Sequence, residues 1–165
     1  MTTLYIIRHG ETEENRNGVF QGQTPGHLSE TGRQQAMNLR KTVASLNFDA
    51  VLCSDLQRCL DTASIILDGM NVGITTTALL RERDMGNLVG TPVKGAHLNP
   101  SVESIGSIRE RSREFLSLLR RHYDNKSVLV ISHGFFIRVL LAEIAGIPPM
   151  DIPKMNNCEI RIANY

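Results

Sequence analysis

The chain has no excess of charge of either sign, since 18 Lys and Arg residues face 17 Asp and Glu residues and the formal net charge is +1. Such a balance creates no long-range field toward nucleic acid or a membrane surface, so we expect neither as a partner. The sequence also lacks any apolar run near the roughly 18 residues of a membrane-spanning helix. Its N-terminus lacks the basic and apolar regions of a signal peptide, so we expect no secretory leader.

Cysteine is scarce: the chain has three, Cys53, Cys59 and Cys158. An odd number without metal-type spacing does not indicate a disulfide framework, so we expect reduced thiols in a cytoplasmic protein. None of the three lies beside a histidine in the sequence, which does not favour a reactive cysteine. The chain also lacks a cluster of carboxylates, histidines and cysteines at ligand spacing, so we expect no metal and no other cofactor.

Internal repeats, low-complexity segments and linkers are absent as well, so we expect one domain over residues 1–165. Short apolar runs alternate with segments in which apolar residues recur at helical spacing. The predicted strands are 4–7, 49–54, 75–78, 127–131 and 158–163, and the predicted helices are 30–46, 56–67, 102–123 and 135–145. This alternation predicts an α/β fold with a mostly parallel sheet.

The first predicted strand runs directly into Arg8, His9 and Gly10. Ligands bind at the carboxyl ends of the strands in an open parallel sheet, so these residues fall where a site forms. A neutral imidazole at His9 can attack as a nucleophile, and the Arg8 guanidinium can hold the oxygens of an anion. Taken alone the triplet is a weak motif, because most histidines that follow a strand are ordinary loop residues.

Two further predicted strands are followed by similar side chains, Arg58 in one case and His133 in the other. Neighbouring parallel strands would bring both beside Arg8. Cations about 4 Å apart repel by roughly 4 kcal/mol per pair at an effective dielectric constant near 20. An anion such as a phosphate dianion therefore belongs among them. The alternative is that the two arginines pair with surface carboxylates such as Glu11 or Asp55.

Motifs along the chain resemble those of the histidine phosphatase superfamily, in its phosphoglycerate mutase-like branch. They occur in the family's order at 8–12 (RHGET) with Asn15, 20–22 (FQG), 28–32 (LSETG), 54–58 (SDLQR), 80–82 (LRE), 103–104 (ES), 132–134 (SHG) and 156–157 (NN). Separate motifs agree over nearly the whole chain, so the resemblance is specific. It implies a three-layer α/β/α sandwich with a mostly parallel central sheet.

The resemblance also implies a phosphatase mechanism in which His9 attacks phosphorus and becomes phosphohistidine. Glu82 would protonate the leaving oxygen and then take a proton from water, with Asp84 as the backup candidate. A surface ion pair with Arg81 or Arg83 is the alternative role for Glu82. The expected catalytic residues are His9, Glu82, His133, Arg8 and Arg58, and the expected substrate-binding residues are Arg8, Asn15, Gln21, Gly22, Arg58, Glu82, His133 and Gly134.

The segment after Glu82 is short for a mutase of this family. Around residues 83–104 it leaves room only for a small cap, whereas the family's mutases carry a long insertion there. Met85 stands where the mutase pattern has tyrosine, and Val89 where many phosphatases have glutamate. We therefore expect a metal-independent phosphatase that hydrolyses phosphate monoesters of small metabolites.

Several alternatives stay open at this stage. A phosphoglycerate mutase and an α-ribazole phosphatase use the same chemistry, and a phosphoprotein phosphatase would use the short cap to admit a partner's side chain. A non-catalytic phosphate-binding regulator is disfavoured, because every expected catalytic residue is present. The sequence does not determine the oligomeric state, and a homodimer is one of the arrangements left open.

Overall fold

Five strands form one sheet in the order β3-β2-β4-β1-β5 in the computed structural model, which describes residues 1–165. They are β1 (Thr3–Arg8), β2 (Ala50–Ser54), β3 (Ile74–Thr77), β4 (Ser127–Ser132) and β5 (Ile160–Asn164). All neighbouring pairs are parallel except β1 with β5. The predicted adjacency of the three central apolar runs is confirmed, because β2, β4 and β1 are neighbours.

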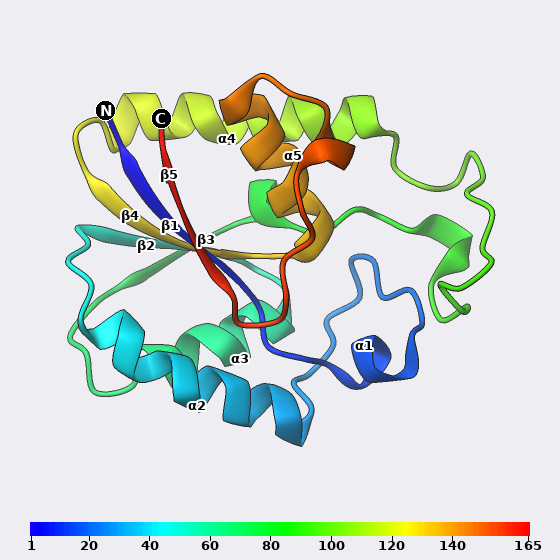
Figure 1. Ribbon diagram of the computed structural model, residues 1–165, viewed down its shortest axis with the longest axis horizontal. Coiled ribbons are helices and arrows are strands. Elements are labelled where there is room, and N and C mark those ends of the chain that lie inside the picture. The colour runs from blue at the N-terminus through cyan, green and yellow to red at the C-terminus, as the bar shows by residue number, and fades with distance from the viewer.

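Helices cover both faces of this sheet and make three layers (Figure 1). One face carries α2 (Glu30–Ala44) and α3 (Gln57–Ile66), and the other carries α4 (Ile105–His122) and α5 (Gly134–Ala145). Successive strand residues point to opposite faces, so Ile6 packs into the core under α4 and α5 while Ile7 packs into the core under α2 and α3. The predicted α/β/α sandwich is confirmed. None of the helices is both long and apolar enough to cross a membrane.

The helices differ from the predictions where a local capping interaction determines where the helix begins. Helix α4 begins at Ile105, three residues late, because the Ser104 hydroxyl accepts a hydrogen bond from the Ser107 amide and caps the helix. Helix α1 (Glu13–Asn17) lies between the first predicted strand and the first predicted helix, where no element was predicted. It buries none of its residues, so it has no apolar periodicity to read, and a Thr12–Asn15 capping box starts it.

Two segments lie beyond the carboxyl edge of the central strands. One contains α1, and the other is the predicted cap segment around 83–104, which contains η2 (Gly86–Leu88) (Figure 1). The two segments are joined through their backbones: Phe20 N donates to Thr91 O at 2.9 Å, and Gly90 N donates to Phe20 O at 2.8 Å. Two remaining short elements are η1 (Ala78–Leu80) and η3 (Pro149–Asp151).

Candidate active site

The rings of His9 and His133 meet at the carboxyl edge of the sheet. Their centroids are 5.2 Å apart and their planes are inclined by 61°. His9 follows β1 and His133 follows β4, and the parallel register that pairs Arg8 with Ser132 brings the two histidines side by side. The predicted convergence of these two strand ends is confirmed.

The His9 imidazole is held in one orientation. Its Nδ1 lies 2.7 Å from the carbonyl oxygen of Gly10. A carbonyl only accepts, so Nδ1 carries the hydrogen and Nε2 keeps its lone pair. Burial, together with the Arg58 and Arg8 guanidinium groups, lowers the pKa of His9 well below its ordinary value. The ring is therefore neutral at physiological pH, which is the form that attacks as a nucleophile.

The backbone around His9 is fastened to the start of α2. A Cβ atom on Gly10 would lie 2.7 Å from the carbonyl oxygen of Gly32, so the two segments approach as closely as glycine allows. The Glu11 amide donates to Gln35 at 2.9 Å, and the Glu11 carboxylate accepts from the Ser29 hydroxyl at 2.7 Å. Glu11 therefore fixes the loop, and it is not an ion-pair partner of either arginine.

Arg8 lies in the wall of the cavity beside His9. Its Nη1 donates to the Met155 carbonyl at 2.6 Å, and its buried Nε has no hydrogen-bond partner. Burial lowers the pKa of Arg8, and the Glu82 carboxylate acts in the opposite direction. A desolvated guanidinium with free donors is suited to hold a phosphate.

Most of the N–H donors of Arg58 form hydrogen bonds within the protein. Its Nε donates to His133 Nδ1 at 3.1 Å, while Nη1 donates to Thr24 O and Nη2 to Gly22 O, each at 2.6 Å. The side chain is 1% exposed, yet it still contributes to the cavity wall. The sequence predicted a free phosphate ligand here, whereas the guanidinium mainly anchors the 22–25 loop. The suggested pairing with Asp55 is not found, because Asp55 binds Arg81 at 2.6 Å.

His133 lies under the cavity and forms no part of its wall. Since Arg58 Nε can only donate, His133 Nδ1 is the acceptor, and Nε2–H donates to the Ser54 hydroxyl at 2.8 Å. Burial and the neighbouring Arg58 and His9 lower the pKa of His133 well below its ordinary value. His133 was predicted to bind phosphate, but in the structure it lies behind Arg58, and both of its ring nitrogens are already hydrogen-bonded to the protein.

Cys59 also contacts His133, with Sγ 3.4 Å from Nε2. No pattern in the sequence indicates this contact, because the two residues are 74 positions apart. Burial raises the pKa of the Cys59 thiol well above its ordinary value, so the group is a neutral thiol. It packs against the ring rather than serving as a thiolate nucleophile.

Glu82 lies at the N-terminus of α5 and in the cavity wall. Its carboxylate accepts hydrogen bonds from the amides of Phe135 and Phe136 at 3.1 Å and of Arg83 at 2.8 Å. These are backbone donors, so the suggested side-chain ion pair with Arg81 or Arg83 is not what holds it. Asp84 is exposed, and its carboxylate accepts from the Gly86 amide away from the cavity.

Asn15 and Gln21 line the cavity but differ in what remains free. The Asn15 oxygen accepts from the Thr12 amide and from Asn157, which leaves its Nδ2 without a protein partner. Gln21 is committed on both sides, since Oε1 accepts from the Thr12 hydroxyl and Nε2 donates to Glu14. The free Nδ2 of Asn15 is therefore available to donate to a phosphoryl oxygen. Gln21 instead holds the loop together through its bonds to Thr12 and Glu14.

The two predicted glycines act through their backbones. Gly22 has a left-handed φ of +55°, and its carbonyl accepts from Arg58. A Cβ atom on Gly134 would lie 3.1 Å from Arg8 Nε, so the absence of a side chain there allows Arg8 to lie against the start of α5. Gly134 does not line the cavity beside His9; it lines a second hollow, which shares Arg8, Glu82, Val93 and Phe135 with that cavity.

The cavity beside His9 has a volume of about 290 Å³. It is lined by Arg8, His9, Asn15, Val19, Phe20, Gln21, Gly22, Arg58, Glu82, Arg83, Met85, Val93, Leu98 and Phe135. Seven of the residues predicted from the sequence are in this set. The apolar members were not predicted as site residues, although Phe20 stands in the 20–22 motif, Met85 departs from the mutase pattern and Phe135 directly follows the 132–134 motif. No three His, Cys, Asp or Glu side chains gather closely enough to hold a metal ion.

Comparisons with known proteins agree with this geometry. The profile of the histidine phosphatase superfamily (branch 1) matches residues 4–165. The chain is 32% identical over 155 residues to "Uncharacterized phosphatase PhoE" of Bacillus subtilis, covering 90% of this chain and 80% of that protein. It is 31% identical over 179 residues to "Probable phosphoglycerate mutase GpmB" of Erwinia tasmaniensis, covering 97% and 83%.

A solved structure, that of Bacillus stearothermophilus YhfR, has the same fold. It superposes with a TM-score of 0.88 at 28% identity and covers 98% of this chain and 90% of its own. The match of the family profile over nearly the whole length, together with the histidine pair at the carboxyl edge of the sheet, identifies the family. The chain belongs to the histidine phosphatase superfamily, branch 1.

Proposed function

We propose that this protein is a metal-independent phosphatase that hydrolyses phosphate monoesters of small metabolites through a phosphohistidine at His9. The observation that carries the proposal is the tautomer and orientation of the His9 ring. Its Nδ1–H donates a hydrogen bond to Gly10 O at 2.7 Å, which leaves Nε2 as the attacking atom. The same cavity wall carries the cations Arg8 and Arg58 and the carboxyl group of Glu82. The phosphatase name of the Bacillus subtilis relative supports the same reaction.

Two half-reactions follow from this arrangement. In the first, His9 Nε2 forms a bond to phosphorus while the ester P–O bond breaks, and the Glu82 carboxylic acid gives its proton to the departing alkoxide. In the second, a water molecule attacks phosphorus, Glu82 takes a proton from that water, and the N–P bond breaks to release phosphate. Arg8, Asn15 and the remaining N–H of Arg58 stabilise the charge on the phosphoryl oxygens in both steps.

Hydrolysis is favoured over transfer because the cavity is open to water. Leu98 and Val93 of the cap segment line the cavity and are 53% and 48% exposed, so water reaches the part of the cavity wall that they form. A mutase must hold its intermediate away from water until the second hydroxyl is phosphorylated. The mutase name of the Erwinia tasmaniensis relative makes this the second candidate function.

One assay separates these functions. The purified protein is mixed, in EDTA, with a panel that includes phosphorylated metabolites, α-ribazole phosphate, phosphoglycerates and a phosphopeptide. We expect release of inorganic phosphate from small esters in the chelator, and loss of release in the His9→Asn variant. Interconversion of phosphoglycerates with little free phosphate would indicate a mutase, and a requirement for a divalent ion would contradict the metal-independent mechanism.

We also propose a cytoplasmic location. All three cysteines are free, and two of them, Cys53 and Cys59, are buried. Unpaired thiols are usual in a compartment that keeps cysteine reduced. Fractionation of the source cells, with detection of the protein by antibody, tests this proposal.

A further inference from the structure

The cavity beside His9 has two chemically different halves. We call the buried polar part of the lining, with His9, Arg8, Arg58, Asn15 and Glu82, the inner half. We call the rest the outer half; its six apolar side chains are Val19, Phe20, Met85, Val93, Leu98 and Phe135, and the charged Arg83 lies beside Phe135. A substrate bound with its phosphate in the inner half must place its alcohol portion against the outer half.

The apolar half is built by backbone pairing between two segments. Val19 and Pro92 form an antiparallel bridge, and Val93 N donates to Gly18 O at 2.8 Å. Met85 is 6% exposed and is packed against Gly22, where a Cβ atom would lie 3.2 Å from the Met85 Cβ. The wall therefore exists before any ligand binds, which lowers the entropic cost of binding.

Most polar groups near the outer half are already occupied, and the exception is the Nη groups of Arg83, which have no protein partner. The Glu82 carboxylate is held by three backbone amides. Arg83 donates from Nε to the Glu103 carbonyl at 2.8 Å, and its guanidinium lies 5.1 Å from the centroid of the Phe135 ring. The wall thus offers few partners for the hydroxyl groups of a sugar, whereas Leu98 and Val93 present exposed apolar surface that a ligand would cover.

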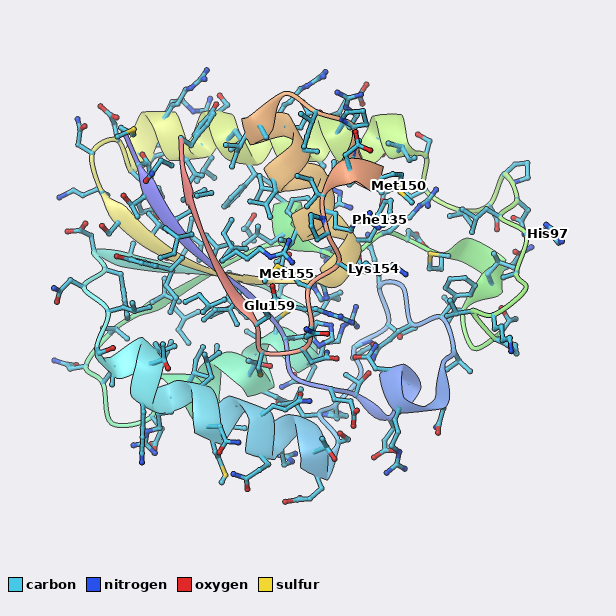
Figure 2. All side chains as sticks on the ribbon, viewed as in Figure 1. His97, Phe135, Met150, Lys154, Met155 and Glu159 are labelled. Atoms are coloured by element: carbon cyan, nitrogen blue, oxygen red, sulfur yellow. The ribbon has the colours of Figure 1, made fainter.

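In-line geometry places the leaving group of the substrate beside the apolar outer half of the cavity. In an in-line displacement the departing oxygen lies opposite His9 and beside its proton donor. Glu82 is the proposed donor, and Glu82 and Phe135 line the same cavity, so the alcohol leaves toward the part of the wall that contains Phe135. A second hollow of about 300 Å³ lies alongside and shares Arg8, Glu82, Val93 and Phe135. Figure 2 shows Phe135 near Lys154 and Met155, which line that hollow.

We propose that the outer half is a subsite for an apolar leaving group, so that the preferred substrates are phosphate monoesters of aryl or medium-chain alkyl alcohols. This inference rests on the proposed phosphatase function. It predicts that affinity and rate rise with the apolar area of the alcohol that is removed from water. It also predicts little preference for esters of polyhydroxylated alcohols of similar size.

A homologous series of ethyl, butyl and hexyl phosphate tests the proposal, because these alcohols differ in apolar area and hardly in acidity. We expect kcat/KM to rise by about threefold to fourfold for each buried methylene. We expect glycerol phosphate to react more slowly than butyl phosphate. Equal values of kcat/KM along the series would overturn the apolar subsite while leaving the phosphatase function in place. Absence of hydrolysis with every ester would instead overturn the proposed function.

Variants of the wall locate the effect. Leu98→Asn and Val93→Asn should each reduce the ratio of kcat/KM for hexyl phosphate to kcat/KM for ethyl phosphate by at least about threefold. Leu98→Met keeps an apolar side chain at the same position and should keep the wild-type ratio. The ratio is taken within one variant, so damage to the fold cancels. Met150→Ser is the matched control, since Met150 is 65% exposed and lines neither hollow. An unchanged ratio in both asparagine variants would contradict the assignment of this wall.

Discussion

Arg58 donates a hydrogen bond from Nε to Nδ1 of His133 at 3.1 Å. The bond assigns the hydrogen of the buried imidazole to Nε2, which faces the hydroxyl of Ser54 at 2.8 Å. It also turns the rest of the guanidinium toward the carbonyls of Gly22 and Thr24. One arginine therefore links the histidine pair to the loop that forms a side of the cavity.

The first prediction concerns this double role. Arg58→Lys keeps the charge but loses the planar fork, so it cannot bond to His133, Gly22 and Thr24 together. We expect kcat/KM to fall at least about 100-fold and the free energy of unfolding to fall by about 2–4 kcal/mol, because some of the buried acceptors lose their hydrogen-bond donor. Urea unfolding and steady-state kinetics measure the two effects. Arg121→Lys, a conservative change on the exposed side of α4, is the control and should alter neither.

The second prediction is covalent catalysis at His9. His9→Asn should reduce turnover by at least about 10³-fold, since His9 is the only histidine that lines the cavity. Rapid acid-free quenching with a labelled phosphate ester should trap an acid-labile adduct on His9 in the wild type and none in the variant. His122→Asn, at an exposed position, should keep the adduct. A labelled adduct that persists in His9→Asn would assign the nucleophile to another residue.

The third prediction separates Glu82 from Asp84 as the proton donor. Glu82→Gln cannot protonate a leaving oxygen, so hydrolysis of alkyl phosphates should fall by about 10²–10⁴-fold. Hydrolysis of p-nitrophenyl phosphate should fall by less than about tenfold, because that leaving group departs without a proton. Asp84→Asn should change neither, since Asp84 is exposed and outside the cavity. Equal losses for both esters in Glu82→Gln, or the selective loss in Asp84→Asn, would contradict the assignment.

The fourth prediction is a pH dependence of stability. Burial and nearby cations lower the pKa of both His9 and His133 well below the ordinary value. The unfolded chain therefore binds protons near pH 6.5 that the folded chain does not, and the folded state loses stability as the pH falls through that value. Each histidine should account for about 1.4 kcal/mol of loss between about pH 7.5 and about pH 5.5.

Urea unfolding at those two pH values measures the loss. In His9→Asn the difference between the two free energies of unfolding should shrink by about 1.4 kcal/mol relative to the wild type. A substitution at an exposed position that does not titrate supplies the control, and Met150→Ser should show the wild-type difference. A His9→Asn variant with the wild-type difference would show that His9 is protonated alike in the folded and unfolded chains.

The order of residues along the chain is enough to predict the sheet and the convergence of its motifs. Buried strands need apolar runs, and the polar residues that follow them collect at one edge when the strands are parallel. These two rules alone bring Arg8, His9 and His133 together. They do not reveal α1, because a five-residue helix with no buried side chain has no apolar period.

The tertiary structure alone determines which side-chain donors are free to bind substrate and which are bonded within the protein. Which donors of Arg58 remain free depends on the path of the 22–25 loop, and loops carry no periodic signal. The contact of Cys59 with His133 joins α3 to the end of β4, and the apolar wall of the cavity joins residues near Val19 to residues near Leu98. Such contacts depend on packing between distant segments, which the local order of residues does not specify.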